Sequence, residues 1–188
     1  MEKIHEMVVK CVQVLDPEIR VVFKDVPAGY ALPDKKEIVL PDYQYDFFMI
    51  IKAAFHEVAH IMFSTDVSLS DLDSEEANAL DTIEQAYVNY HFCLRYPKLE
   101  VTFNRFYKDS IEEMKGSGMV GSNFFWRELE YVLFDVDIGE GLQSEQCKKL
   151  YERGVIQDLW EVIKSSQSSK ELVSGAKRLA RECNSLDI

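Results

Sequence analysis

Two histidines four residues apart, His56 and His60, lie in the most clearly helical part of this 188-residue sequence. From Tyr43 to about Ser64, apolar residues recur at the three- and four-residue spacing of a broad helix face. At that spacing the two imidazoles lie on one face, about one turn of 5.4 Å apart. The segment therefore predicts a helix that presents two imidazoles and, beside the first, the carboxylate of Glu57.

Side chains of these types at this spacing indicate a zinc centre. Two imidazoles one turn apart can both reach one Zn²⁺ at about 2.0–2.1 Å. Zinc lowers the pKa of a bound water to about 7, and Glu57 can take a proton from that water and pass it to a leaving amine. The alternative is two helix histidines with ordinary partners, but the helical context supports the motif.

A catalytic zinc of this kind needs a third protein ligand and one open position. The next long helix, predicted from Glu75 to Leu94, offers Asp81, Glu84 and His91 as candidates. Glu84 lies among apolar residues of a half-buried helix, where a carboxylate needs a partner that a metal would supply. A solvated or salt-bridged Glu84 is the alternative.

The whole chain predicts an α+β, mostly α fold, read as one domain of residues 1–188 with a core of residues 1–96 and a helical extension of residues 97–188. A hairpin is expected from Tyr30–Leu32 to Glu37–Leu40 within a small N-terminal antiparallel sheet. Gly154 suits a helix C-terminus, and the flexible stretch 116–122 suits a loop or, alternatively, a lid. The remaining predicted elements are helix 2–15, strand 19–26, and helices 99–115, 123–137, 144–154, 155–166 and 169–183.

Composition narrows the classes of partner. The net charge of −12 argues against nucleic acid and against anionic membrane surfaces, which both reward Lys and Arg clusters. The four cysteines form no close pair, so we expect small core side chains in a reducing compartment. The N-terminus lacks a signal-peptide core, and Lys52 interrupts the longest apolar stretch, so we expect a cytoplasmic protein without a membrane span.

Three blocks of the sequence resemble the gluzincins, which are zincins with two histidines and a glutamate as zinc ligands. More narrowly, the chain resembles phage and bacterial metallopeptidase-like proteins grouped with the cobaltochelatase T-subunit-like proteins. The blocks are "GYALPDKKEIVLP", "HEVAHIMFSTD" and "NALDTIEQAYVN", between about Tyr30 and Asn89. The third block departs from the family pattern, with Gln85 where aspartate is usual and Tyr87 where arginine is usual.

The resemblance implies a zincin-like fold with His56, His60 and Glu84 as zinc ligands and Glu57 as general base, while Asp81 stays the rival third ligand. It implies a zinc metallopeptidase of phage or bacterial type that acts on a peptide or protein, with a regulatory protein partner as a further expectation. A phage protein of this kind would work in the host cytoplasm.

The same analogy gives the predicted strand "EIVL" the role of an edge that offers its backbone to an extended peptide. The alternative is an ordinary edge strand that the protein covers.

Three further residues have weaker assignments. Asp66 could accept the ring N–H of a ligand histidine, or could simply belong to the turn that ends the helix. Tyr87 or His91 could donate a hydrogen bond to a tetrahedral oxyanion, or could simply be packed.

Two rival functions stay open. The first is a catalytically inactive zinc-binding module for protein interaction, which the departures at Gln85 and Tyr87 allow and the intact Glu57 disfavours. The second is an interaction protein without a metal, built from the C-terminal helices.

Overall fold

The computed structural model describes residues 2–42, 47–116, 122–134, 142 and 144–186. The chain divides into two compact units, Met1–Ser64 and Thr65–Ile188. The fold is mostly helical with one three-stranded sheet, which confirms the α+β, mostly α class. The boundary between the units follows Ser64, so the helix that carries Glu84 belongs to the second unit.

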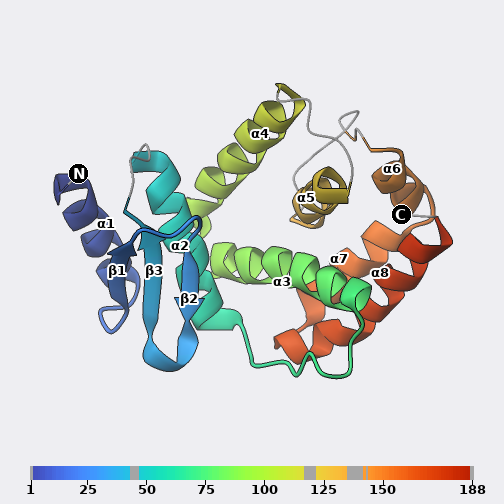
Figure 1. The fold of residues 1–188 in the computed structure, drawn as a ribbon, viewed down its shortest axis with the longest axis horizontal. Coiled ribbons are helices and arrows are strands. Elements are labelled where there is room, and N and C mark those ends of the chain that lie inside the picture. Colours follow the sequence, from blue (N-terminus) through green and yellow to red (C-terminus); the bar gives the residue numbers. More distant parts are fainter. Residues whose placement is uncertain (1, 43–46, 117–121, 135–141, 143, 187–188) are drawn as a thin grey trace. The chain divides into compact units, whose positions relative to one another are not determined.

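The first unit combines two helices with the sheet (Figure 1). Helices α1 and α2 pack against each other, α1 also contacts β1, and α2 also contacts β2 and β3. The elements are α1 (Glu2–Leu15), β1 (Arg20–Lys24), β2 (Tyr30–Leu32), a 3-10 turn (Pro33–Lys35), β3 (Glu37–Pro41) and α2 (Phe47–Phe63). The expected hairpin between β2 and β3 is confirmed, and Lys36 closes its turn with a left-handed φ of 46°.

The sheet is mixed, so the predicted antiparallel sheet is wrong for one of its strands. The strand order is β1-β3-β2, and β1 runs parallel to β3 with Arg20 opposite Glu37. Because β3 is the central strand, the prediction that "EIVL" is an edge strand is also wrong; β1 and β2 are the edges of the described sheet.

Side-chain burial explains the central place of β3. All five of its residues are buried, and the continuous apolar run from Ile38 to Leu40 is typical of a strand covered on both faces. The one charged residue of the strand, Glu37, is paired with Arg20 of β1, whose Nε donates to Glu37 Oε2 at 2.6 Å. This ion pair joins the two residues that face each other at the start of both strands.

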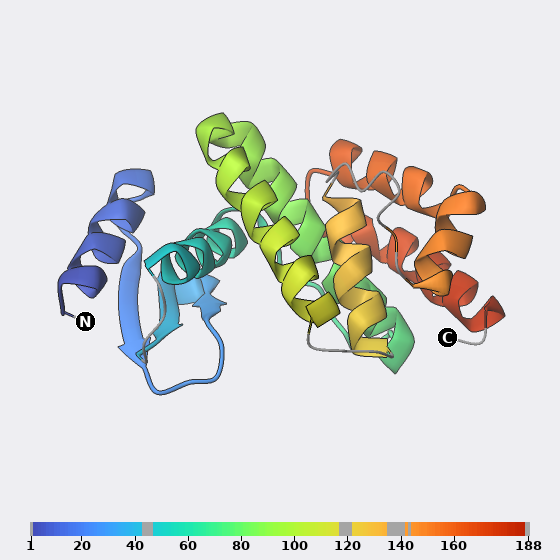
Figure 2. The same cartoon turned by 90° about the horizontal axis from the view of Figure 1, so that it is seen from above.

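The described elements of the second unit are all helices or 3-10 turns and are arranged around α3, which contacts α5, α7 and α8 (Figures 1 and 2). The elements are α3 (Ser74–Arg95), α4 (Glu100–Gly116), α5 (Ser122–Leu133), α6 (Glu145–Glu152), α7 (Val155–Ser165) and α8 (Val173–Ser185), with 3-10 turns at Pro97–Leu99 and Ser169–Leu172. The helix expected over residues 169–183 therefore begins as a 3-10 turn. Residues 117–121, where a loop or a lid was expected, lie outside the described residues.

Local sequence explains where α3 begins and why it is central. The Asp73 carboxylate accepts from the Glu76 N–H at 2.8 Å, and the Glu76 carboxylate accepts from the Asp73 N–H at 3.3 Å. This capping box satisfies donors that the first turn leaves unpaired. Further along, the buried residues of α3 occupy more than one helix face: Ala79, Leu80, Thr82, Ile83, Ala86, Tyr87, Val88, Asn89, Phe92 and Cys93.

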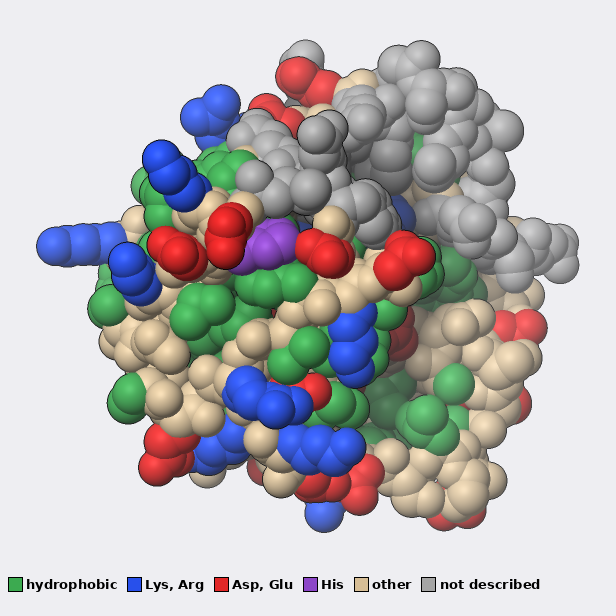
Figure 3. All heavy atoms as spheres, turned by 60° about the vertical axis from the view of Figure 1, so that its left-hand side comes forward, with side chains coloured by type: hydrophobic (Ala, Val, Ile, Leu, Met, Phe, Trp, Pro, Cys, Tyr) green, Lys and Arg blue, Asp and Glu red, His purple; other side chains and the backbone are tan. Residues whose placement is uncertain are grey.

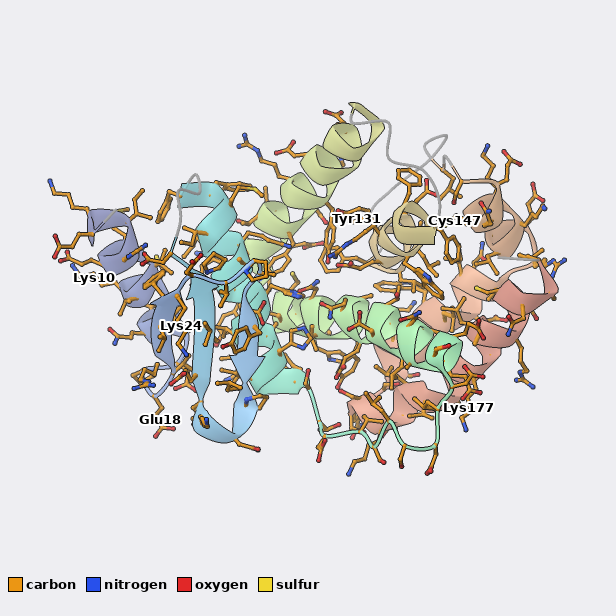
Figure 4. The ribbon with its side chains drawn as sticks, in the orientation of Figure 1. Lys10, Glu18, Lys24, Tyr131, Cys147 and Lys177 are labelled. Atoms are coloured by element: carbon orange, nitrogen blue, oxygen red, sulfur yellow. The ribbon has the colours of Figure 1, made fainter. Side chains whose placement is uncertain are left out.

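A buried polar chain joins α3, α4 and α5. Asn89 of α3 donates to the hydroxyl of Tyr107 in α4, and that hydroxyl donates to Glu130 Oε1 of α5 at 3.3 Å. Arg127 donates to the other Glu130 oxygen at 3.0 Å. The ring of Tyr131, labelled in Figure 4, packs edge-on against the Tyr107 ring at 4.5 Å between centroids. These hydrogen bonds give the buried Glu130 carboxylate partners, without which its burial would cost free energy.

Three of the four cysteines are core residues, as expected. Cys93, Cys147 and Cys183 are buried, Cys11 is half-buried, and all four are free thiols. Cys147 of α6, labelled in Figure 4, contacts α5, with its Sγ 3.9 Å from the Phe125 carbonyl oxygen. Burial raises the pKa of the Cys147 thiol well above its ordinary value, so the protonated, apolar form is favoured.

Charged side chains of both signs lie on the face shown in Figure 3. In Figure 3, which brings the left-hand side of Figure 1 forward, acidic and basic side chains alternate with hydrophobic ones over the described part of the view. Among the described helices, none has the length and apolar character needed to span a membrane.

Candidate metal site

Helix α2 places the two histidines together. Its apolar residues Ile50, Ala54 and Val58 are buried, which orients the helix on the sheet and leaves His56 and His60 half-buried. The two rings lie 4.8 Å apart between centroids and are nearly perpendicular, at 87°. The expected pairing of the imidazoles on one helix face is therefore confirmed.

A hydrogen bond orients the ring of His60. Its Nδ1 lies 2.8 Å from the hydroxyl oxygen of Ser64, one helical turn further on. Metal-binding histidines commonly use their second ring nitrogen in such a bond, which fixes the tautomer and the ring orientation. Ser64 makes the kind of bond that we expected of Asp66; the Asp66 side chain is exposed, and its role stays a prediction.

Glu57 is a buried carboxylate beside this pair. It is 8% exposed, and among the described residues no side chain or backbone group donates a hydrogen bond to it. Burial raises its pKa from 4.5 to about 7, and the positive charge of Lys52 opposes the rise. No fully buried polar side-chain atom among the described residues lacks a hydrogen-bond partner, so the Glu57 oxygens keep some contact with solvent. The carboxylate is still largely removed from water, which costs free energy.

Gly29 gives the Glu57 carboxylate its room. A Cβ added to Gly29, the residue before β2, would lie 3.3 Å from Glu57 Oε1 and equally close to the Leu40 side chain and the Val39 carbonyl oxygen. That spacing is tighter than ordinary van der Waals contact. The loop before β2 therefore approaches Glu57 closely because it has a glycine there.

The two candidate third ligands lie in different surroundings on α3. Glu84 is half-buried, and its Oε1 accepts from the Ser169 hydroxyl at 2.6 Å. Asp81 is exposed and accepts from the side-chain amide of Gln85 at 3.1 Å. Glu84 is thus held by a second element, whereas Asp81 makes a contact within its own helix, and the choice of third ligand stays a prediction.

Tyr87 and His91 have packing partners in the second unit. Tyr87 is 2% exposed, and its ring lies 4.5 Å from the His91 ring between centroids. His91 Nε2 lies 3.3 Å from the Ile163 carbonyl oxygen of α7. Burial lowers the pKa of His91, which favours the neutral ring, and burial raises the pKa of Tyr87. These contacts give both residues a structural role, and the oxyanion role stays a prediction.

Each half of the expected ligand set is described within its own unit, because His56 and His60 belong to the first and Glu84 to the second. Within the described residues, no three His, Cys, Asp or Glu side chains gather closely enough to hold a metal ion. The donor chemistry nevertheless fits zinc, which favours imidazole and carboxylate ligands.

Sequence reasoning missed Ser64, Ser169 and Gly29. Ser64 follows His60 at the four-residue spacing of a helix and could have been found from that spacing. Ser169 lies 85 residues after Glu84, and no local pattern indicates that contact. Gly29 lies just before a strand, a common place for glycine, so its presence in the sequence did not indicate a close contact with Glu57.

Comparison of the chain with family models, with curated proteins and with solved structures found no match. The resemblance to the gluzincins stays a prediction from the residues.

Proposed function

We propose that this chain is a zinc-dependent peptidase in which His56, His60 and Glu84 hold the metal and Glu57 is the general base. The observation that carries the proposal is the Glu57 carboxylate, buried beside the imidazole pair without a hydrogen-bond partner among the described residues. A zinc site used only for stability has no need of such a group. A general base, by contrast, must be a carboxylate that can take up a proton. A pKa of about 7 suits proton exchange at neutral pH.

The reaction would be hydrolysis of a peptide bond. A zinc ion held by these ligands would supply Lewis acidity toward the peptide carbonyl and the attacking water. Glu57 accepts a proton from that water as its oxygen bonds to the carbonyl carbon. When the C–N bond breaks, Glu57 returns the proton to the leaving nitrogen, so the carboxylate ends each cycle unchanged.

An extended peptide would add to the sheet at β2 and not at β3, which is central. Gly29 immediately precedes Tyr30 of β2 and lies against Glu57. A substrate backbone that follows β2 would therefore run toward the proposed base.

Metal content tests the ligand set without any substrate. Elemental mass spectrometry of the wild type should give about one zinc per chain, with the metal lost in Glu84→Ala and retained in Asp81→Ala. Zinc loss only in Asp81→Ala would move the third ligand by one helical turn. A wild type that takes up no zinc after reloading would refute the site.

Activity tests the base. The zinc-loaded wild type should cleave an unstructured protein, with products identified by mass spectrometry, and Glu57→Gln should keep zinc and lose cleavage. Equal cleavage by Glu57→Gln would refute the mechanism. Zinc binding by a wild type that cleaves nothing would favour the inactive zinc-binding module instead.

A further inference from the structure

A buried hydrogen-bond chain ends on Glu84. Ser169, the first residue of the 3-10 turn before α8, is 0% exposed, and its hydroxyl donates to Glu84 Oε1 at 2.6 Å. The backbone N–H of Thr65 donates to the same hydroxyl oxygen at 3.1 Å. All three residues belong to the second unit.

The two bonds together fix the direction of the hydroxyl proton. A serine hydroxyl has one proton to donate and lone pairs to accept with. The Thr65 N–H uses a lone pair of Ser169 Oγ, and the same hydroxyl donates its one proton to Glu84 Oε1. Hydrogen bonds to an ionised carboxylate are short and stronger than neutral ones, in keeping with the 2.6 Å distance.

We propose that Ser169 is a positioning residue for Glu84 as a metal ligand, and this inference rests on the proposed function. The bond to Oε1 restrains the rotation of the carboxylate and leaves Oε2 as the oxygen that this contact does not use. Partners that hold ligating carboxylates in this way typically affect metal affinity by about 10–100-fold. Ser169 thereby connects the turn before α8 to the ligand on α3.

The chain offers a matched control. Ser166 is 4% exposed, and its hydroxyl donates at 2.7 Å to the Val162 carbonyl oxygen at the end of α7. Ser166→Ala removes a buried serine hydroxyl of the same kind three residues from Ser169, without touching Glu84. Ser169→Thr keeps the hydroxyl and is the conservative variant.

The experiment measures zinc affinity by competition with a chromophoric chelator, and the visible absorption of the Co²⁺-substituted protein, whose bands report on the ligand set. We expect Ser169→Ala to bind zinc about 10–100-fold more weakly than the wild type and to show altered cobalt bands. Ser169→Thr should stay near the wild type, and Ser166→Ala should match it. A purely structural role would leave the cobalt bands of the folded variant unchanged.

The outcomes separate this inference from the proposed function. A wild type that binds neither metal refutes the proposed function itself. A wild type that binds zinc, with the same affinity and cobalt bands in Ser169→Ala, overturns the role of Ser169 and leaves the zinc site standing. If circular dichroism shows Ser169→Ala to be unfolded, Ser169→Thr is compared with Ser169→Val, which has the same shape without the hydroxyl. Equal zinc affinity in that pair overturns the inference.

Discussion

Replacing Glu57 by glutamine should make the metal-free protein more stable at neutral and alkaline pH. Burial holds the pKa of Glu57 near 7 in the folded chain against 4.5 for the ordinary side chain. At about 1.36 kcal/mol per pKa unit, that interval corresponds to about 3 kcal/mol. Glu57 is only 8% exposed, so screening by water removes little of this cost.

The sign of the effect follows from where the proton is bound. Below pH 4.5 the side chain is protonated in both the folded and the unfolded state, and the substitution changes little. As the pH rises from 4.5 to about 7, the unfolded chain releases its proton first, so the folded wild type loses stability. Above about pH 7 the full cost is present, and Glu57→Gln should gain about 3 kcal/mol.

Urea unfolding of chelator-treated protein at pH 4.5, 6 and 8 measures this difference. Glu152→Gln, an exposed change on α6, is the control and should give the same small difference at every pH. A Glu57→Gln protein that gains no stability between pH 4.5 and 8 would refute the assignment of Glu57 as a desolvated carboxylate. It would also remove the main support for its role as a base.

Three further substitutions test other parts of the description. Gly29→Ala should crowd the Glu57 carboxylate and lower peptide cleavage about tenfold or more with zinc content unchanged; full activity would contradict the close approach of that loop. Gly154→Ala should lower the free energy of unfolding, measured in urea, by about 1–2 kcal/mol, because φ is 74° at this position. Apart from its neighbours in the chain, no atom of the described residues lies within 4 Å of the added Cβ, so backbone strain is the expected cause, and an unchanged free energy of unfolding would argue against the left-handed turn. Tyr107→Phe should lower the free energy of unfolding by about 1–3 kcal/mol in the same assay, because it removes the hydroxyl that donates to buried Glu130. An unchanged urea midpoint would show that this hydrogen bond contributes nothing to stability.

Periodicity and end signals were enough for the helices that carry the candidate site. The four-residue spacing of His56 and His60 is a local property, and the structure brings the rings together as expected. The acidic start of α3 and the glycine at the end of α6 are local signals too, and both are confirmed.

Contacts between distant residues could not be predicted in the same way. The parallel pairing of β1 with β3 depends on which strand takes the middle position, and alternation within a strand does not encode its neighbour. The run Ile38–Leu40, apolar at every position, was the available sign of a central strand. The support of Glu84 by Ser169 joins residues 85 positions apart and is set only by tertiary packing.

The central place of α3 has a consequence for how the second unit opens. Local opening in proteins starts where few contacts are lost and reaches the most buried elements last. Helix α3 packs against α5, α7 and α8, so its middle turns, from Ala79 to Cys93, should be the last backbone amides to exchange with deuterium. Glu84 lies within those turns. The proposed ligand is thus carried by the part of the unit that fluctuates least, so release of a metal would leave its backbone in place for the next ion.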